Sequence, residues 1–438
     1  MIISISLLLA AQVALPDTVS LSLQDALLRA HEFNPTLRAE QAEATAVAQG
    51  QLEASRAFLP NIRFDAQGVR STDPVAAFGM KLRQENFAME DLSLDALNRP
   101  PSYSGFSSSI TLELPILAPE GLYGFRAARR GAAARDAGAR RAGGATTFFV
   151  TMAYGDAVLA ESRVQALTSA FEAANSHAEQ AEALHAQGLV TGLDARLAQI
   201  GAAAVETKLL AATAQAANAL SALRALLALP DTIPLILTDS LDGDETTTCS
   251  AEVTACDIGN RGDLEALRLG SAASAAMIGS AWGKNLPSVA LFGSLTHHGR
   301  STPFGEGSGD WTVGIGVRWN VLSALSGVGA VRRANAEHDA ALARYEAAER
   351  QAVVEVRSAE RMLTAAIERV AVAAAAENEA TLALEQARLR YRTGTSPITE
   401  LLDVQAAATD AALQLNEARR DLIVAKAALD FAYGANDR

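Results

Sequence analysis

The chain has 438 residues, of which 49% are hydrophobic and 20% are charged, so it is too apolar to be a disordered protein. Its formal net charge of −13 comes from acids dispersed along helical stretches, so we expect no nucleic-acid partner. Aromatic residues make up only 5%, and much of the apolar content is alanine, which favours helices but adds little core volume. The composition therefore predicts long helices that pack closely through small side chains.

Residues 1–14 are apolar and uncharged, and the run ends before Pro16 and Asp17. The segment is too short to cross a bilayer, which is typical of a signal peptide; a buried N-terminal strand is the alternative. No later segment reaches about 18 continuous apolar residues, so we predict no transmembrane helix.

The sequence contains two related halves, because three short motifs recur in the same order. The motif pairs are Leu59-Pro60-Asn61 with Leu286-Pro287-Ser288, Gly124 with Gly329, and Gly188 with Gly394. The first pair is spaced more widely, which predicts a longer connection within 71–104 of the first half. We predict a first structural repeat at 15–230, a linker at 231–260 and a second repeat at 261–438.

Each half is predicted to contain a helix, two strands, a very long helix, a turn and a last helix. The strands are indicated by alternation of apolar and polar residues in segments that begin near Ile62, Ile110, Val289 and Trp311. A half-buried strand of a soluble sheet alternates in the same way, so this pattern alone leaves the setting of the sheet open.

Two observations favour strands that cross a membrane. The strands run for about ten residues, which is near the length that a tilted strand needs to cross a bilayer. Trp311 and Trp319 are about 26 Å apart along a strand, which matches two aromatic girdles at the edges of an apolar band. Because four strands cannot close a barrel, several chains must share one, and a conducting pore favours three or more.

The helices are too long for a globular domain. The proline-free run of 121–187 would extend about 100 Å, and the run of 324–392 is comparable. A further helix is predicted from Gly394 to about Tyr433. Its heptads alternate large and small residues, with Leu415, Leu422 and Leu429 against Ala411, Ala418 and Ala425, and Val356, Leu363 and Val370 repeat the spacing on the preceding helix. An ordinary antiparallel coiled coil would explain the heptads but not the strands.

Residues with reactive side chains form no convincing catalytic or metal site. Cys249 and Cys256 lie in one polar stretch, which predicts a disulfide, with two free thiols as the alternative. His297 and His298 fall in a predicted loop, where a solvated role is favoured over metal binding. We expect no cofactor and no enzymatic activity.

Several weak motifs in a fixed order resemble the TolC-type outer-membrane efflux family over nearly the whole chain. They are Asn34-Pro35-x-Leu37 followed by Leu59-Pro60, Arg261-Gly262-Asp263-Leu264 followed by Leu286-Pro287, the loop motifs Phe78-Gly79-x-Lys81-Leu82-x-Gln84 and Leu97-Asn98-x-Pro100, and the turns Gly188-Leu189-Val190-Thr191 and Tyr391-Arg392-Thr393-Gly394-Thr395. The resemblance implies a mainly α protein whose homotrimer forms a twelve-stranded outer-membrane barrel and a helical periplasmic tunnel. It also implies a periplasmic adaptor protein and an inner-membrane pump of the RND or ABC class as partners.

The resemblance places functional residues at the two turns. The adaptor would dock at the hairpin tips, through Gly188, Leu189, Thr191, Gly394 and Thr395; helix caps without a partner are the alternative. Ser396 and Pro397 are predicted to cap and start the last helix.

The gate is predicted to lie at Tyr391, Glu400 and Asp403. Tyr391 matches a gate position of the family, whereas Ser396 stands where some members carry a basic residue. In three copies, Glu400 and Asp403 would form two stacked acidic rings that favour cations; alternatively, Glu400 merely complements the helix dipole. The predicted function is a passive outer-membrane exit duct for small molecules or polypeptides, and a periplasmic or surface coiled-coil interaction protein is the alternative.

Overall fold

A computed structural model describes residues 19–241, 258–320 and 324–437. Its α-helices are α1 (Leu23–Phe33), α2 (Pro35–Ala54), α3 (Pro74–Arg83), α4 (Leu94–Asn98), α5 (Pro119–Ala186), α6 (Gly192–Leu226), α7 (Gly262–Gly283), α8 (Ala324–Arg392) and α9 (Ile398–Tyr433). Its strands are β1 (Val19–Leu21), β2 (Asn61–Ser71), β3 (Tyr103–Leu117), β4 (Leu235–Leu237), β5 (Ser288–Gly299) and β6 (Gly307–Arg318). Short 3-10 helices are η1 (Ser55–Ala57), η2 (Met89–Leu92) and η3 (Ile258–Asn260).

Among the described residues, every helix falls short of the combination of length and apolarity that a membrane crossing requires.

The element order confirms the predicted internal repeat. The first half runs α2, β2, β3, α5 and α6, and the second runs α7, β5, β6, α8 and α9. The longer connection expected within 71–104 contains α3, η2 and α4. The predicted signal peptide at 1–14 and the Cys249 and Cys256 pair lie outside the described residues.

The chain divides into two compact units, each with its own contacts. One unit holds Met1–Ala42, Ala137–Glu265 and Ala347–Arg438, and we call it the hairpin unit. The other holds Glu43–Asp136 and Ala266–Glu346, and we call it the sheet unit.

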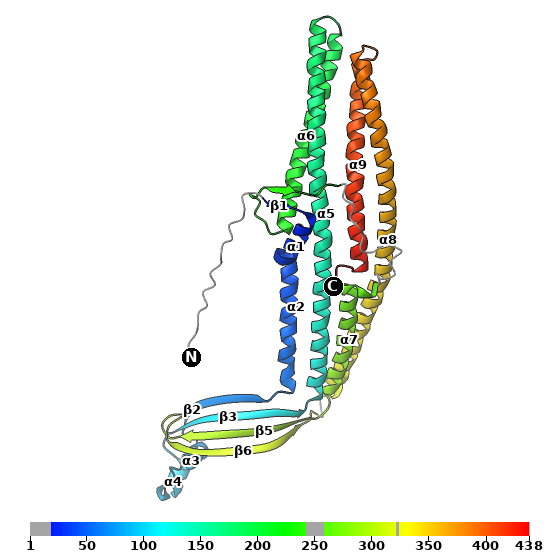
Figure 1. Cartoon of the computed structure of the whole chain (residues 1–438). Coiled ribbons are helices and arrows are strands. Elements are labelled where there is room, and N and C mark those ends of the chain that lie inside the picture. Colours follow the sequence, from blue (N-terminus) through cyan, green and yellow to red (C-terminus); the bar gives the residue numbers. More distant parts are fainter. Residues whose placement is uncertain (1–18, 242–257, 321–323, 438) are drawn as a thin grey trace. The chain divides into compact units, whose positions relative to one another are not determined.

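Two long helical hairpins form most of the hairpin unit, α5 with α6 and α8 with α9 (Figure 1). Their buried side chains are mainly alanines, as in the cluster of Ala174, Ala178, Ala181, Ala195, Ala198, Ala202 and Ile398. Because alanine side chains are short, the helix backbones approach closely, which is the packing that the composition predicts.

The heptad prediction is confirmed only in part within one protomer. On α9, Leu415, Ala418, Ala425 and Leu429 are buried. Ala411 and Leu422 are only half-buried, as are Leu363 and Val370 on α8. A regular heptad therefore does not guarantee a continuous buried seam, because burial also depends on where the neighbouring helices bend or end.

A two-stranded parallel sheet, β1 with β4, is a feature that the sequence did not predict. It pairs Val19 with Leu235 and Leu21 with Leu237. The side chains of Leu21 and Leu235 are buried in one cluster with Val150 and Tyr154 of α5. The start of the expected linker at 231–260 therefore forms β4, which packs within the hairpin unit.

The sheet unit contains one antiparallel sheet with the strand order β2-β3-β5-β6. All four predicted strands are confirmed, and β2 extends beyond its predicted segment to Ser71. The prediction of a loop around His297 and His298 was wrong, because both residues belong to β5. Their partners in the register, Gly309 and Ser308 on β6, extend the hairpin beyond the apolar segment that set its predicted end.

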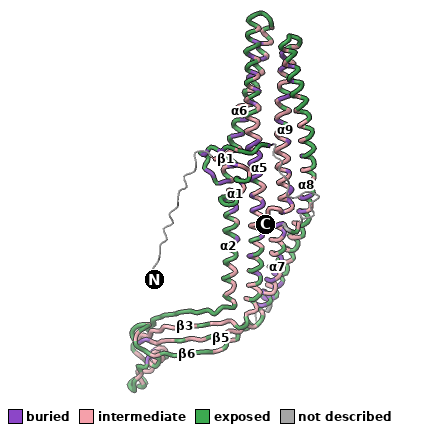
Figure 2. Tube along the Cα trace, viewed as in Figure 1, coloured by how far each residue is buried: buried purple, intermediate pink, exposed green. Residues whose placement is uncertain are grey.

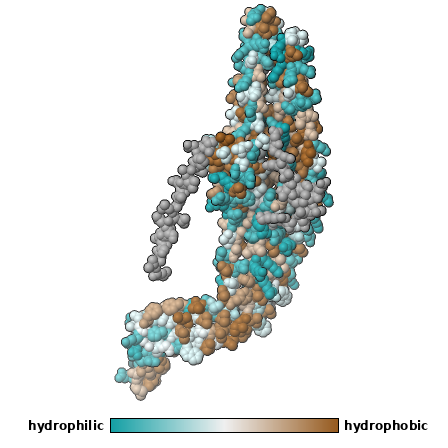
Figure 3. Space-filling model, viewed as in Figure 1, coloured by the Kyte–Doolittle hydropathy of each residue, from teal (hydrophilic) through white to brown (hydrophobic). Residues whose placement is uncertain are grey.

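The sheet has one apolar and one polar face. The register aligns Phe64, Ile110, Leu295 and Trp311 across the four strands, and beside them Ile62, Leu112 and Val313. The next position of each strand is polar, as in the row Arg63, Thr111, Ser294 and Thr312. The apolar face is exposed rather than covered, with Trp311 at 71% exposure (Figures 2 and 3).

Candidate functional site

The two hairpin turns share one backbone design. Gly188 and Gly394 have φ angles of 75° and 71°, a left-handed conformation that glycine adopts without the penalty of a Cβ atom. Leu189 N donates to Leu184 O at 2.9 Å, and Thr395 N donates to Arg390 O at the same distance. Each turn thus satisfies the terminal carbonyl groups of its long helix through a Schellman motif.

The two turns differ in how the following helix begins. Thr191 caps α6: its Oγ1 accepts from Asp194 N at 3.2 Å, and the Asp194 carboxylate accepts from Thr191 N at 3.0 Å. The prediction that Ser396 caps α9 was wrong. The cap position is Pro397, which makes no side-chain capping bond, and the buried Ser396 Oγ has no hydrogen-bond partner among the described residues.

Apolar side chains are exposed at the first turn. Leu189 is 67% exposed and Leu193 is 65% exposed, although contact of a leucine side chain with water is unfavourable. Thr395 and Gly394 at the second turn are also exposed. The end of the α5–α6 hairpin therefore presents apolar surface that no other described part of the protomer covers, whereas the exposed residues of the second turn are glycine and threonine.

The predicted gate residues lie near the second turn, in three different environments. Tyr391 packs against two alanine-rich clusters, and its hydroxyl has no hydrogen-bond partner in the described part of the chain. Burial raises the pKa of the Tyr391 hydroxyl, and the charge of Asp194 raises it further. Glu400 forms an ion pair with Arg390 of α8, whereas Asp403 is exposed on α9.

The Arg390–Glu400 pair was not predicted, and it changes the charge expected at the predicted constriction. The two residues face each other because the turn at Gly394 folds α9 back along α8. The sequence did contain a signal for this pair, because Arg390 precedes Gly394 and Glu400 follows it at a similar distance along the chain. The pair offsets the charge of Glu400, so Asp403 carries the uncompensated negative charge of the two predicted rings.

Near the turns, His177 of one hairpin lies close enough to Arg388 of the other for the two to interact electrostatically, which the sequence did not indicate. His177 of α5 has a buried Nε2 with no hydrogen-bond partner among the described residues. Burial lowers the pKa of His177, and the nearby positive charge of Arg388 lowers it further. The guanidinium of Arg388 donates to Gln405 Oε1 of α9 at 3.0 Å. A neutral histidine is therefore favoured at this interface.

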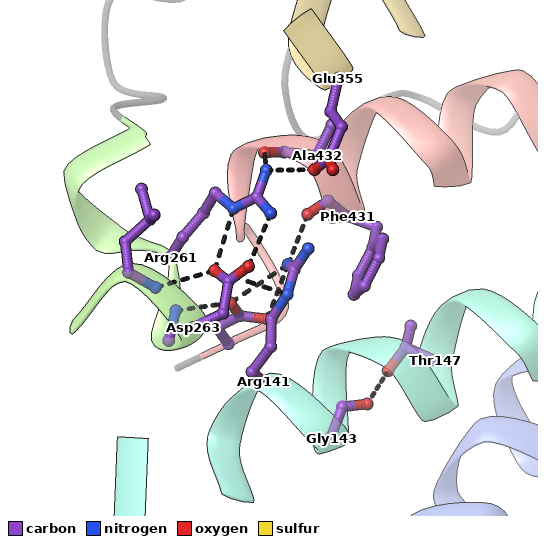
Figure 4. A network of polar contacts seen from close by, with 11 residues as sticks. Arg141, Gly143, Thr147, Arg261, Asp263, Glu355, Phe431 and Ala432 are labelled. Atoms are coloured by element: carbon purple, nitrogen blue, oxygen red, sulfur yellow. Dashed lines mark hydrogen bonds and ion pairs between the residues drawn. The ribbon is translucent and has the colours of Figure 1, made fainter. Parts of the chain in front are cut away.

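The repeat start at Arg261 forms a polar network that ties α7 to the long helices (Figure 4). Arg261 donates two hydrogen bonds, of 3.0 and 2.7 Å, to the carboxylate of Asp263. Its Nη1 donates to Glu355 of α8 at 2.9 Å. Arg141 of α5 also points at Asp263, with its Nε 3.8 Å from the carboxylate. Its Nη1 lies 3.3 Å from the fully buried carboxylate of Asp437.

Burial and charge act in opposite directions in this network. Burial lowers the pKa of Arg141, and the charges of Asp437 and Asp263 offset this only in part. Burial raises the pKa of Asp263, but the bonds to Arg261 and the positive charges of Arg141 and Arg261 together outweigh this and hold the pKa below its usual range. The partner carboxylates of Arg261, on Asp263 and Glu355, are 37% and 42% exposed, so water offsets part of the lost pairing, and loss of Arg261 should cost less than the ~3–5 kcal/mol of a fully buried pair.

The family model of outer membrane efflux proteins matches residues 26–229 and 258–435. The chain belongs to this family. The double match confirms the two internal repeats, and membership makes the chain an outer-membrane efflux channel that extends into the periplasm. The Arg261-Gly262-Asp263 motif carried part of the sequence resemblance. In the structure, its arginine and its aspartate pair with each other in the polar network at the start of α7.

Solved structures of other channels share the fold of this efflux-family chain. The CmeC outer membrane channel of Campylobacter jejuni has a TM-score of 0.79 at 18% identity, with 94% of this chain and 86% of that chain covered. The outer membrane protein VceC of Vibrio cholerae has a TM-score of 0.76 at 19% identity, covering 94% and 96%. The open state of the Neisseria gonorrhoeae MtrE channel has a TM-score of 0.76 at 20% identity, covering 94% and 88%. No curated protein matches the chain.

The predicted aromatic girdle residues and the adjacent histidines all lie in or next to the sheet. Trp311 lies within β6, and Trp319 follows its last residue, with its Nε1 donating to Asn285 O at 3.1 Å. His297 and His298 each bond within the sheet unit, to Gly305 O and to the Asp310 carboxylate. Among the described residues, no group of three or more His, Cys, Asp or Glu side chains could hold a metal ion.

Proposed function

We propose that the chain acts as one third of a homotrimeric exit duct. Three copies would join their four-stranded sheets into one twelve-stranded barrel, and their hairpins would form a periplasmic tunnel. Solutes or polypeptides pass through it without chemical change. The alternative of a periplasmic or surface coiled-coil interaction protein is disfavoured, because it leaves the sheet and the family unexplained.

The exposed apolar face of the sheet is the observation that carries this proposal. Val313, Ile315 and Val317 are all more than 60% exposed in one protomer, and lipid is the natural environment for such a surface. Backbone groups at the outer edges of β2 and β6 cannot stay unsatisfied in lipid, so neighbouring copies must pair with them. Trp311 and Trp319 serve as the aromatic girdles of the barrel.

The hairpin ends carry the contacts with the export machinery. A periplasmic adaptor docks at the tips through Gly188, Leu189, Thr191, Gly394 and Thr395, and the exposed leucine supports this role. An inner-membrane pump of the RND or ABC class supplies the energy. Tyr391, Glu400 and Asp403 line the constriction, where Asp403 favours cations.

The repeats run from 15 to 230 and from 261 to 438, and residues 231–260 link them. The two stretches matched by the family model support these bounds. Residues 1–14 act as a signal peptide, and Cys249 and Cys256 form a disulfide.

The experiment that tests the duct is the mass of the protein complex, extracted from isolated outer membranes in mild detergent. We expect about three times the 45.7 kDa of one chain, less the signal peptides. A water-soluble monomer that needs no detergent would contradict both the trimer and the lipid-facing sheet.

A further inference from the structure

The segment between β2 and β3 crosses the end of the sheet rather than forming a simple loop. Its helix α3 begins at Pro74, and Asp73 caps it by accepting from Ala76 N at 2.8 Å. Met80 then packs against Gly105 of β3. At the far end, the carbonyl of Arg83 accepts from the Ser308 hydroxyl of β6. Thus α3 starts beside one edge strand and ends at the other.

Gln84 fixes the end of this crossing. Its side chain is only 2% exposed, and its Nε2 donates to Gly299 O at 2.9 Å and to Ser104 O at 3.3 Å. Its Oε1 accepts from the Tyr103 hydroxyl at 3.0 Å. Arg300 Nε donates to the Gln84 carbonyl at 3.2 Å. Because these bonds reach the start of β3 and the end of β5 at once, the crossing has one defined position.

The chain that follows projects beyond β6 as a small apolar knob, which we define as Met89, Leu92 and Leu94. Figure 1 shows α4 past α3 on the β6 side of the sheet. An ion pair between Lys81 Nζ and Asp91 at 2.5 Å, and an edge-to-face contact of Phe78 with Phe87, hold it to α3. Met89 is 84% exposed and Leu94 is 79% exposed, so the protomer builds this knob and leaves it uncovered.

A partly apolar groove, which could accept the apolar knob, lies toward the β2 edge of the sheet. A cavity of about 400 Å³ runs between α3 and strands β2 and β3, lined in part by Val69, Val75, Ala76, Gly79 and Phe106. Val75 at its rim is 80% exposed. Phe106 alternates with the apolar face, but the other β2 and β3 residues of the lining lie on the polar face of the sheet, so the groove is mainly on the face away from lipid; these residues are Gln67, Val69, Gly105 and Ser107.

We propose that the knob of each copy seats in the groove of the next copy, across the seam where β6 of one meets β2 of the other. The inference rests on the proposed trimer and adds a second contact to its seam. The knob projects past β6, and the groove opens beside β2, so a head-to-tail ring brings them together. The contact between knob and groove links protomers at the outer end of the barrel, independently of strand pairing.

Disulfide trapping tests the proposal. In a Cys249→Ser and Cys256→Ser background, the double variant Leu94→Cys with Val75→Cys is oxidised in outer membranes and run on a non-reducing gel. We expect covalent dimers and trimers, while each single variant stays uncrosslinked. If Leu94→Cys alone forms dimers, the knobs meet each other on the axis and the proposal is wrong.

A second measurement separates this proposal from the duct itself. Met89→Asp with Leu94→Asp should leave the complex trimeric but lower by several degrees the temperature at which it dissociates in SDS. Glu90→Gln, in the same segment, should leave that temperature unchanged. A trimer that shows no crosslinking and an unaltered dissociation temperature would contradict the contact between knob and groove but not the trimeric duct. A monomer would contradict both proposals.

Discussion

At the residue scale, the turn glycines are determined by backbone conformation rather than by space. A Cβ atom on Gly188 or Gly394 would meet nothing within 4 Å, but both residues have positive φ angles. Gly188→Ala should therefore destabilise the hairpin unit by about 1–2 kcal/mol. Gly138→Ala is the matched control, because this open position in the interior of α5 should gain about 0.5–1 kcal/mol. Thermal unfolding in detergent, followed by circular dichroism, compares the two; equal shifts would contradict the argument.

The two acidic residues of the proposed gate should contribute unequally to cation selectivity, because Glu400 is ion-paired with Arg390. Because Arg390 already offsets Glu400, we expect Asp403→Asn to lower cation selectivity more than Glu400→Gln does. The double variant should lower selectivity most, and Arg390→Gln should raise it by releasing the charge of Glu400. Reversal potentials under a KCl gradient in planar bilayers measure these effects. Unchanged selectivity in the double variant would remove the acidic rings from the mechanism.

At the element scale, the interface between the two hairpins should depend on pH through His177. Its pKa is lower in the folded protein than its ordinary value of 6.5, so the unfolded chain binds the proton more readily. The associated stability is fully present above pH 6.5 and is lost as pH falls through the lower folded pKa.

His177→Phe removes this titration while filling similar space. Between pH 7.5 and 5.5, the unfolding temperature of the wild type should fall further than that of the variant. All other groups are the same in the two proteins, so their contributions cancel in the comparison. Parallel pH profiles would show that His177 does not contribute.

The sheet sets the behaviour of the whole molecule in the membrane. Val313 and Thr312 are neighbours on β6, but they lie on the apolar and the polar face respectively. Val313→Arg places a charge against lipid, at a cost of about 2–4 kcal/mol at mid-membrane depth, whereas Thr312→Arg faces the lumen. We expect much less folded trimer in outer membranes for Val313→Arg and near-normal amounts for Thr312→Arg. Equal amounts for the two variants would contradict the lipid-facing assignment.

Local patterns were sufficient to predict most elements of the fold. Alternation over Trp311, Val313, Ile315 and Val317 predicted β6, because side chains on a strand point to opposite faces in turn. Absence of proline and richness in alanine predicted helices of nearly 70 residues, which the structure has at 68 and 69 residues in α5 and α8. Gly188 and Gly394 predicted the turns, since few other residues accept a left-handed conformation.

Contacts between distant segments needed the tertiary structure. The β1–β4 pairing joins strands of three residues, too short to leave a periodic signal. The cap of α9 shifted from Ser396 to Pro397, because packing around Ile398 rather than capping preference sets where that helix begins. Arg390 with Glu400, His177 with Arg388, and the crossing that ends at Gln84 each depend on which helix or strand lies alongside. The sequence by itself determined the periodicities, the turns and the repeat, which are local; the structure decided the partners of polar groups, because folding alone brings those residues together.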